Sequence, residues 1–314
     1  MKLSIVIPVY YNENNLLPLY ADLKDKVLNC LDCDYEIIMV DDGSKDGSYE
    51  VIKQLSSIDR CIVPVKLSRN FGEHAATLAG LSVCTGNCAV RKAADMQEDS
   101  GIILEMFDQY KKGHKIVWAR RAQRDEPWGQ VLFSSIYTKL MQKLALPNMP
   151  DGGVDTFLID RQIIDLVVSQ NEPNTPVTEQ ILWSGFSPGY VDYIRKKREI
   201  GKSKWTLSKK VKMAIDSLLG FSYFPVRLMS VIGLFSMLGS LIVGILLLIK
   251  RLSGYIDVEG YTSIMILILL SFGIIMLSIG ILGEYMWRTL DSARKRPPFI
   301  IEEYFQNDDS NNHK

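Results

Sequence analysis

Two stretches, LSIVIPVYYNEN (residues 3–14) and YEIIMVDDGSKDGS (residues 35–48), decide the fold class of this 314-residue chain. Each begins with a run of apolar and β-branched residues and passes directly into polar and acidic ones. A largely apolar run predicts a strand that helices cover on both faces, as in a parallel sheet. In such sheets ligands bind at the carboxyl ends of the strands, so the polar residues that follow each run are the candidates for function.

The same alternation continues to about residue 120. Further strands are expected in CIVPVKLS (61–68), CAVRKAADM (88–96) and HKIVWARR (114–121), and helices near residues 14–31, 48–57, 72–84 and 101–112. Strands that alternate with amphipathic helices predict an α/β domain with a mostly parallel sheet.

Acidic residues recur just past three of the expected strands. Asp41 and Asp42 follow the second strand, and Asp95 follows the fourth, with Gln97 and Glu98 close behind. Carboxylates at neighbouring strand ends suit a nucleotide diphosphate, because one can accept hydrogen bonds from base or ribose and another can hold a divalent cation. The alternative for residues 42–44 is an ordinary turn that leads into a helix, with Ser44 or Asp46 as its cap.

Two uncharged apolar runs, residues 228–249 and 264–282, follow the expected soluble domain. As a helix the first would reach about 33 Å, which matches a hydrocarbon core of roughly 30 Å. Basic residues gather before the first run and after the second, whereas the short loop between them has only Lys250 and Arg251. By the positive-inside rule both termini lie in the cytoplasm. The alternative is a buried helical hairpin in a soluble core.

Charge and patterning complete the expected organisation. The 36 basic and 36 acidic residues cancel, so electrostatics give no case for nucleic acid as a partner, and the basic residues beside the spans suit anionic headgroups. Residues 205–219 carry apolar residues on one side and lysines on the other, which predicts an amphipathic helix in the membrane interface. The predicted divisions are a catalytic domain (1–200), this interfacial region (201–224), two spans (225–287) and a cytoplasmic tail (288–314) disordered from about residue 306.

Seven stretches and the paired spans that follow them carry a further signal: IVIPVYYNEN, EIIMVDDGSKDGS, LSRNFGEHAATLAGL, AADMQED, WARRAQR, VDTFLIDR and REIGKSKW. Together they resemble a known family, the membrane-anchored polyprenyl-phosphate glycosyltransferases of glycosyltransferase family 2. The resemblance implies a nucleotide-binding fold of the glycosyltransferase A type, a nucleotide diphosphate sugar as donor, a divalent metal (Mg²⁺ or Mn²⁺), and a polyprenyl phosphate as acceptor.

The resemblance also implies roles for residues at the strand ends. The expected nucleotide-binding residues are Pro8, Tyr10, Glu13, Asp41 and Asp42. Asp95 and Gln97 match the metal motif, although Ala93 stands where the family often has a first Asp. This departure places metal affinity in question.

A second group of residues is expected on the phosphate and acceptor side. Basic residues that could grip the acceptor phosphate or the diphosphate are Arg121, Arg124, Arg198, Lys202 and Lys204. Asp155 resembles the family's carboxylate near the reacting centre, with Asp160 and Glu179 as competitors for that role. For the lysines at 209, 210 and 212, a solvated basic face near headgroups is the favoured interpretation.

The expected function is that of a membrane-anchored hexosyltransferase of the bacterial inner membrane. It would transfer a sugar with inversion to undecaprenyl or dolichyl phosphate at the cytoplasmic face, and so supply a lipid-linked sugar for cell-surface glycans. The alternatives are transfer to another lipid or to a polysaccharide, and a catalytically weakened nucleotide-binding scaffold, which Ala93 suggests. Small residues at every fourth position, Ser236, Ser240 and Gly244, would allow close helix packing either within the hairpin or between the protomers of a homo-oligomer.

Overall fold

The computed structural model describes residues 1–121, 128–150, 154–170, 175–194, 217, 222, 224–253 and 260–305. Its contacts divide the chain into two units. The first joins Met1–Ser217 with Pro297–Lys314, and the second is Leu218–Arg296. The predicted interfacial helix and the end of the tail lie almost entirely outside the described residues.

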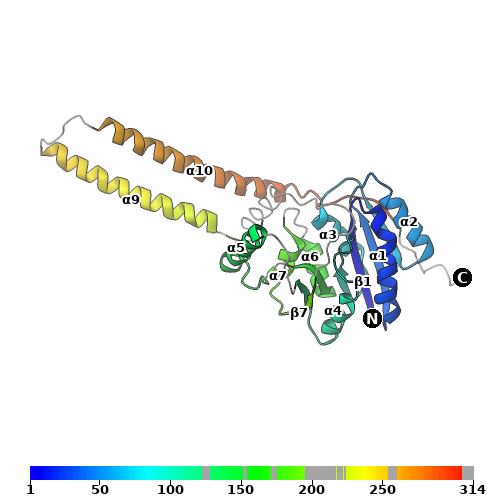
Figure 1. Ribbon diagram of the computed structural model, residues 1–314. Coiled ribbons are helices and arrows are strands. Elements are labelled where there is room, and N and C mark those ends of the chain that lie inside the picture. Colours follow the sequence, from blue (N-terminus) through cyan, green and yellow to red (C-terminus); the bar gives the residue numbers. More distant parts are fainter. Residues whose placement is uncertain are drawn as a thin grey trace. The chain divides into compact units, whose positions relative to one another are not determined.

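The first unit is built on one mixed sheet (Figure 1). Its described strands are β1 (Lys2–Val9), β2 (Asp34–Asp41), β3 (Ile62–Leu67), β4 (Cys88–Arg91), β5 (Ile116–Arg121), β6 (Val154–Asp160), β7 (Pro188–Tyr193) and β8 (Ile301–Tyr304). They lie in the order β7-β5-β6-β4-β1-β2-β3-β8. Parallel pairing joins β4, β1, β2 and β3, and also β5 with β7. The predicted α/β fold with a mostly parallel sheet is confirmed.

Two described strands run against the others. β6 pairs antiparallel with both β4 and β5, and β8 pairs antiparallel with β3 at the edge of the sheet. Neither direction could be predicted from local sequence, since both depend on pairing with strands that are distant in the chain. β8 also lies in the segment predicted only as a tail, so the C-terminal region returns to the sheet of the first unit.

The first unit has seven described α-helices and one short 3₁₀ helix. They are α1 (Glu13–Lys26), the short 3₁₀ helix η1 (Leu28–Cys30), α2 (Ser48–Ile58), α3 (Glu73–Val83), α4 (Ile102–Lys111), α5 (Trp128–Leu144), α6 (Arg161–Gln170) and α7 (Val177–Trp183). On α2, for example, the buried residues Tyr49, Ile52 and Leu55 recur every three positions, which is the spacing of one helical face. All four helices predicted before residue 112 are confirmed.

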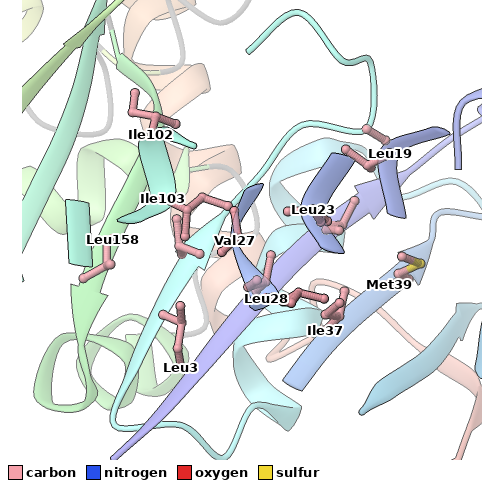
Figure 2. Close-up of a cluster of buried hydrophobic side chains, with 14 of the residues drawn as sticks. Leu3, Leu19, Leu23, Val27, Leu28, Ile37, Met39, Ile102, Ile103 and Leu158 are labelled. Atoms are coloured by element: carbon pink, nitrogen blue, oxygen red, sulfur yellow. The ribbon is translucent and has the colours of Figure 1, made fainter. Parts of the chain in front are cut away.

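The helices form a layer on each face of the sheet. One core cluster joins alternate residues of β1 and β2 to the inner faces of α1, α2 and α4, and Figure 2 shows Leu19 and Leu23 of α1 beside Ile37 and Met39 of β2. On the other face α3 packs against β1, with α6 and α7 beside it. The approach is closest at Gly80, where a Cβ atom would lie 2.4 Å from Val6 Cγ1. Any larger residue there would force α3 away from the sheet.

The second unit is a helical hairpin of α9 (Phe224–Leu252) and α10 (Tyr261–Ala293) (Figure 1). Each contains a stretch long and apolar enough to cross a membrane, Phe224–Val243 and Leu270–Ala293, and none of either stretch is buried. The helices touch near Met229 and Ser278, whose hydroxyl lies 3.8 Å from the Met229 sulfur. Near the end of α10 the Arg294 guanidinium lies over the Trp287 ring at 5.7 Å, a pairing suited to a membrane–water boundary.

Candidate functional site

The carboxyl ends of the central strands meet at one edge of the sheet. In the parallel register Val9 of β1 pairs with Asp41 of β2, and Val6 pairs with Arg91 of β4. The pairing extends one residue past the ends of β2 and β4, the two neighbours of β1. The amide of Asp42 donates to Val9 O (2.8 Å), and the amide of Lys92 donates to Val6 O (2.9 Å). The polar residues predicted after these strands therefore share one edge.

The loop after β1 is tied to the loop after β2. Pro8 is half-buried within β1, and the rings of Tyr10 and Tyr11 meet edge to face with centroids 4.6 Å apart. The amide of Tyr11, which has a left-handed φ of 54°, donates to Ser44 Oγ (3.0 Å). Burial raises the pKa of the Tyr10 hydroxyl. The geometry places Tyr10 at the predicted nucleotide edge.

Glu13 strengthens the same connection. Its carboxylate accepts a hydrogen bond from the amide of Gly47 (3.0 Å), just before α2 begins. Beside it the amide of Asn12 donates to Ser48 Oγ (3.1 Å). Glu13 thus holds the two loops together. In its predicted nucleotide-binding role it would act indirectly, by fixing the conformation of these loops.

Asp41 combines complete burial with an unused acceptor. Its side chain is inaccessible to solvent, and its Oδ2 accepts a hydrogen bond from the amide of Ser44 (3.2 Å). Its Oδ1 has no hydrogen-bond partner. Burial raises the pKa of this carboxyl group. A buried acceptor without a donor is costly, so Asp41 is a site at which an N–H or O–H group of a ligand would be stabilising.

Asp42 differs because both of its oxygens already have partners in the chain. Oδ1 accepts from the amide of Phe71 (2.7 Å) and Oδ2 from that of Gly72 (2.9 Å). The side chain is only 2 % exposed, and this burial raises its pKa to about 6 despite the two donors. Asp42 therefore holds the loop between β3 and α3 against the end of β2. Residues 42–44 can therefore form a turn and still lie beside a bound nucleotide, so the two interpretations of the sequence are compatible.

The loop that Asp42 holds, residues 68–72, lies in the stretch LSRNFGEHAATLAGL, for which the sequence predicts no specific role. It carries the exposed Arg69, whose guanidinium lies 4.0 Å above the Phe71 ring. The loop approaches Gly43 so closely that a Cβ there would lie 2.4 Å from the Arg69 carbonyl carbon. Gly43 also has a φ of +66°. A Gly at position 43 of the Asp-Asp-Gly-Ser stretch is consistent with a close approach of another segment. The sequence does not indicate which segment this is.

The predicted metal motif forms a tight turn after β4. Met96 takes a left-handed φ of 55°, and the amide of Gln97 donates to Asp95 Oδ1 (3.2 Å). The strand itself ends at Arg91, so residues 92–96, which were expected within the strand, lie beyond it. The turn brings Asp95 and Gln97, both half-buried, to the same short segment of the edge.

Two charged residues flank this turn inside the protein. Lys92 is inaccessible to solvent, and its Nζ donates to the backbone oxygen of Glu98 (2.5 Å) and lies 3.8 Å from Glu98 Oε2. Glu98 also accepts from Thr156 Oγ1 (2.5 Å) and from the Tyr193 hydroxyl (3.3 Å). Burial lowers the pKa of Lys92, and the carboxylate of Glu98 opposes that effect. Glu98, which the sequence left as an alternative to Gln97 for the metal, is thus engaged by other groups.

The donor set at the turn fits a hard divalent cation that is shared with a substrate. In the part of the chain that the structure describes, no three His, Cys, Asp or Glu side chains cluster as a metal site of their own. Asp95 and Gln97 offer oxygen donors, which suit Mg²⁺ or Mn²⁺. Magnesium commonly takes one or two carboxylates together with waters and substrate phosphates. The residues present therefore fit such an ion when a diphosphate supplies further ligands.

The three carboxylates predicted for the reacting centre lie in different places. Two of them are on β6, whose reversed direction puts them at opposite edges of the sheet. Asp155 lies near the amino end of β6, at the edge where β4 and β5 end, although its side chain is not described. Asp160 pairs with Cys88 at the start of β4, so it lies at the opposite edge, where the Tyr110 hydroxyl donates to it (2.9 Å). Glu179 is 3 % exposed on α7 and accepts from the hydroxyls of Tyr137 and Ser217. Of the two carboxylates on β6, Asp155 is therefore the one at the predicted site edge.

The basic residues are described only in part. Arg121 ends β5, pairs with Tyr193 of β7, and donates from Nε to the Tyr193 hydroxyl (3.4 Å). This places a half-buried guanidinium at the same edge of the sheet. The other four predicted phosphate-binding residues lie outside the described residues: Arg124, Arg198, Lys202 and Lys204.

Comparison with known proteins gives consistent matches. The family described as Glycosyl transferase family 2 matches residues 4–167. The uncharacterised glycosyltransferase YkcC of Bacillus subtilis is 33% identical over 310 residues, 97% of this chain and 94% of that protein. The bactoprenol glucosyl transferase of Shigella phage SfV is 30% identical over 304 residues, 96% of this chain and 98% of that protein.

A solved structure resembles the fold. It is glucosyl-3-phosphoglycerate synthase from Mycobacterium tuberculosis in complex with Mn²⁺, UDP-glucose and phosphoglyceric acid. The match covers 69% of this chain and 77% of the other, with a TM-score of 0.50 and 17% identity, and so concerns the fold alone.

Proposed function

Because this chain belongs to glycosyltransferase family 2, we propose that it transfers a sugar from a nucleotide diphosphate sugar to a polyprenyl phosphate at the cytoplasmic face of a membrane. The activity class, a glycosyltransferase, follows from the family. The donor, the acceptor and the location are the parts proposed.

The proposed acceptor is supported by relatives that match along nearly the whole chain. The relatives named bactoprenol glucosyl transferases cover 96% of it, and therefore the region of α9 and α10 as well as the sheet. A lipid phosphate is a substrate that a membrane presents to an enzyme with two such helices. Arg121, at the edge beside β7, is the described residue that we assign to the acceptor phosphate, because guanidinium groups bind phosphate by charge-assisted hydrogen bonds.

The proposed donor site lies at the ends of β1, β2 and β4. We assign the base or ribose contact to Asp41, because its Oδ1 is a buried acceptor in need of a donor. Asp42 and Glu13 would shape the pocket through the loops that they hold. We assign Asp95 and Gln97 to a divalent metal, which when bound neutralises the charge that builds on the departing diphosphate.

The proposed reaction is a direct displacement with inversion. An oxygen of the lipid phosphate forms a bond to the anomeric carbon while the bond from that carbon to the diphosphate breaks, and the nucleoside diphosphate leaves. A phosphate monoester with a second pKa of about 6 is largely dianionic at neutral pH, so its oxygen needs no general base. The task of Asp155 would then be to orient the acceptor or a sugar hydroxyl.

The path of the chain supports the proposed topology. It leaves the catalytic unit after Ser217, forms the hairpin, and returns at Pro297 so that β8 pairs with β3. If α9 and α10 each cross the bilayer, both flanking segments are on one side. The basic residues outside the hairpin favour the cytoplasmic side.

A transfer assay tests this proposal. The detergent-purified protein would be incubated with Mn²⁺ or Mg²⁺, a panel of nucleotide sugars beginning with UDP-glucose, and undecaprenyl phosphate. We expect a lipid product whose mass exceeds that of the acceptor by one anhydro-sugar. The configuration of its anomeric carbon, measured by NMR, would show whether transfer occurs with inversion. Sugar transfer to other lipids or to polysaccharide, without transfer to the polyprenyl phosphate, would contradict the acceptor assignment.

A further inference from the structure

A buried network connects the turn after β4 to strands that are distant in sequence. Its centre is Glu98, which is 5 % exposed and contacts the Lys92 amine, the Thr156 hydroxyl and the Tyr193 hydroxyl. These partners come from the end of β4, from β6 and from β7. No role proposed above uses Glu98 or Lys92.

We propose that Glu98 is a positioning residue that holds the metal-binding turn, and with it Asp95 and Gln97, in register with the strands that carry Asp155 and Arg121. This inference rests on the proposed function in one respect, since it takes Asp95 and Gln97 as the metal ligands. It adds a residue that acts through them without touching substrate or metal.

The first argument concerns the turn itself. Lys92 and Glu98 bracket residues 93–97, and the Lys92 Nζ bonds the backbone oxygen of Glu98 at 2.5 Å. This contact closes the segment at its base, while the left-handed φ of Met96 and the bond from the Gln97 amide to Asp95 shape its tip. A lysine inaccessible to solvent needs a compensating charge, and the Glu98 carboxylate at 3.8 Å supplies it.

The second argument concerns what the carboxylate of Glu98 reaches. Thr156, which donates at 2.5 Å, is the residue next to Asp155 on β6. Tyr193, which donates at 3.3 Å, pairs with Arg121 in the register of β5 and β7 and accepts its Nε at 3.4 Å. One carboxylate thereby connects the donor-side turn to β6, which carries Asp155, and to β7, which pairs with the strand that carries Arg121.

The third argument is that this turn carries few ligands. Ala93 stands where a second carboxylate is expected, so the placement of Asp95 has more influence on metal affinity than it would in a fuller ligand set. Residues that orient metal ligands from outside the coordination sphere typically change metal affinity by about 10- to 100-fold when they are substituted.

The chain offers a matched control in Glu36. It is 6 % exposed, and it likewise contacts one lysine (Lys2) and two hydroxyls (Ser4 and Thr85). It lies near the start of β2, however, at the amino edge of the sheet and away from the proposed site. Glu36→Gln therefore reproduces the loss of a buried, paired carboxylate without touching the turn.

The test compares Glu98→Gln with Glu36→Gln in the full-length protein. Mn²⁺ binding in the presence of UDP is measured by electron paramagnetic resonance, the Mn²⁺ concentration for half-maximal transfer by activity, and Tm by thermal unfolding. We expect both variants to lower Tm, but only Glu98→Gln to weaken Mn²⁺ binding, by about tenfold or more. Equal Mn²⁺ affinity in the two variants would overturn the proposal.

Two further variants separate positioning from stability. Lys92→Met combined with Glu98→Gln removes both buried charges, so Tm should recover relative to Glu98→Gln alone while Mn²⁺ binding stays weakened. In an Asp95→Asn background, Glu98→Gln should have little additional effect on Mn²⁺ affinity, because it acts through Asp95. Recovery of Mn²⁺ affinity together with Tm would show that Glu98 serves stability alone, and full additivity with Asp95→Asn would overturn the proposal that Glu98 acts through Asp95.

These measurements are independent of the acceptor. If the wild-type protein binds Mn²⁺ with UDP but transfers no sugar to undecaprenyl phosphate, the acceptor proposal fails and the role of Glu98 is still tested by binding. If the wild-type protein transfers sugar and Glu98→Gln leaves Mn²⁺ binding unchanged, the proposed function stands and the role of Glu98 fails.

Discussion

At the scale of single residues, Asp41 and Asp42 show how neighbours with the same side chain acquire different tasks. Asp42 accepts the amides of Phe71 and Gly72, whereas Asp41 keeps one buried oxygen without a partner. The difference arises because Asp42, just past β2, lies against the loop after β3, whereas Asp41, the last residue of β2, accepts the Ser44 amide through Oδ2. One carboxylate therefore supports the loop, and the other remains available to a ligand.

The raised pKa of Asp42 predicts a pH dependence of stability. Its pKa is about 6 in the folded protein, above the unfolded value of about 3.9. The folded state therefore binds the proton more tightly, and the contribution of Asp42 is fully present below about pH 4 and lost as pH rises to about 6. Asp41, whose pKa is also raised, acts in the same direction.

Asp42→Asn should remove this part of the pH dependence. The difference in free energy of unfolding between wild type and variant is expected to shrink by about 2 kcal/mol from pH 4 to pH 7, because ionised Asp42 carries the cost of burial and Asn does not. Urea unfolding in detergent at several pH values measures it. Parallel curves for the two proteins would show that the pKa of Asp42 is ordinary.

Arg121 carries a prediction about the acceptor. Arg121→Ala should lower transfer to polyprenyl phosphate by roughly tenfold to a hundredfold, because a charge-assisted hydrogen bond is lost, and Arg121→Lys should restore it only in part. Binding of the donor nucleotide, measured by calorimetry, should change little. Equal losses in transfer and nucleotide binding would reassign Arg121 to the donor diphosphate.

The adjacent arginine is the control for that experiment. Arg120 is paired with Asp192 on the exposed surface, at 2.7 and 3.1 Å. An exposed pair contributes little to stability, so Arg120→Ala should leave both transfer and nucleotide binding nearly unchanged.

At the scale of elements, the connection after β2 depends on how closely the loop after β3 approaches it. Gly43→Ala would bring a Cβ to 2.4 Å from the Arg69 carbonyl carbon, at a φ of +66°. Backbone atoms cannot rotate away as a side chain can, so the loop that Asp42 holds would have to shift. We expect at least about tenfold weaker nucleotide binding by calorimetry, which corresponds to about 1.4 kcal/mol.

Gly113→Ala provides the comparison for Gly43→Ala. Gly113 has a φ of +101°, but a Cβ there would meet nothing within 4 Å, and it lies in the connection between α4 and β5. The Gly113→Ala protein should therefore be less stable because of backbone strain, but its affinity for nucleotide should be unchanged. If both variants bind nucleotide equally well, contact between the two loops is unimportant to the site.

At the scale of the whole molecule, the catalytic unit is discontinuous in sequence. β8 is held to the sheet by pairing with β3, by the bond from the Ser68 amide to Ile300 O (3.0 Å), and by the Tyr49 hydroxyl on Glu303 (3.0 Å). A chain that leaves this unit and returns to it can cross a membrane only an even number of times. The number of membrane crossings in the hairpin is thereby constrained by the fold of the first unit as well as by the composition of the hairpin.

Cysteine accessibility tests this topology. In a variant whose only cysteine is Tyr255→Cys, in the segment between α9 and α10, we expect labelling of intact cells by a membrane-impermeant reagent. A variant that keeps only Cys30, which is exposed in the catalytic unit, should be labelled only after the membrane is permeabilised. The reverse pattern would overturn the proposed orientation.

The sequence by itself determined the features that rest on local pattern. The alternation of apolar runs and amphipathic helices established the mostly parallel sheet, and the positions of Asp41, Asp42 and Asp95 after strands placed them at one edge. The length and composition of two apolar runs predicted the long helices α9 and α10. Each of these depends on residues that are close together in the chain.

Only the tertiary structure decided which distant groups meet. The reversal of β6 brings Asp155 to the site edge and takes Asp160 to the other edge. Glu98 meets Thr156 and Tyr193 across 58 and 95 residues, and Tyr49 meets Glu303 across 254. The physical reason is that hydrogen bonds and strand pairing between remote segments leave no periodic trace in sequence. They arise only when the packed sheet brings the partners within reach.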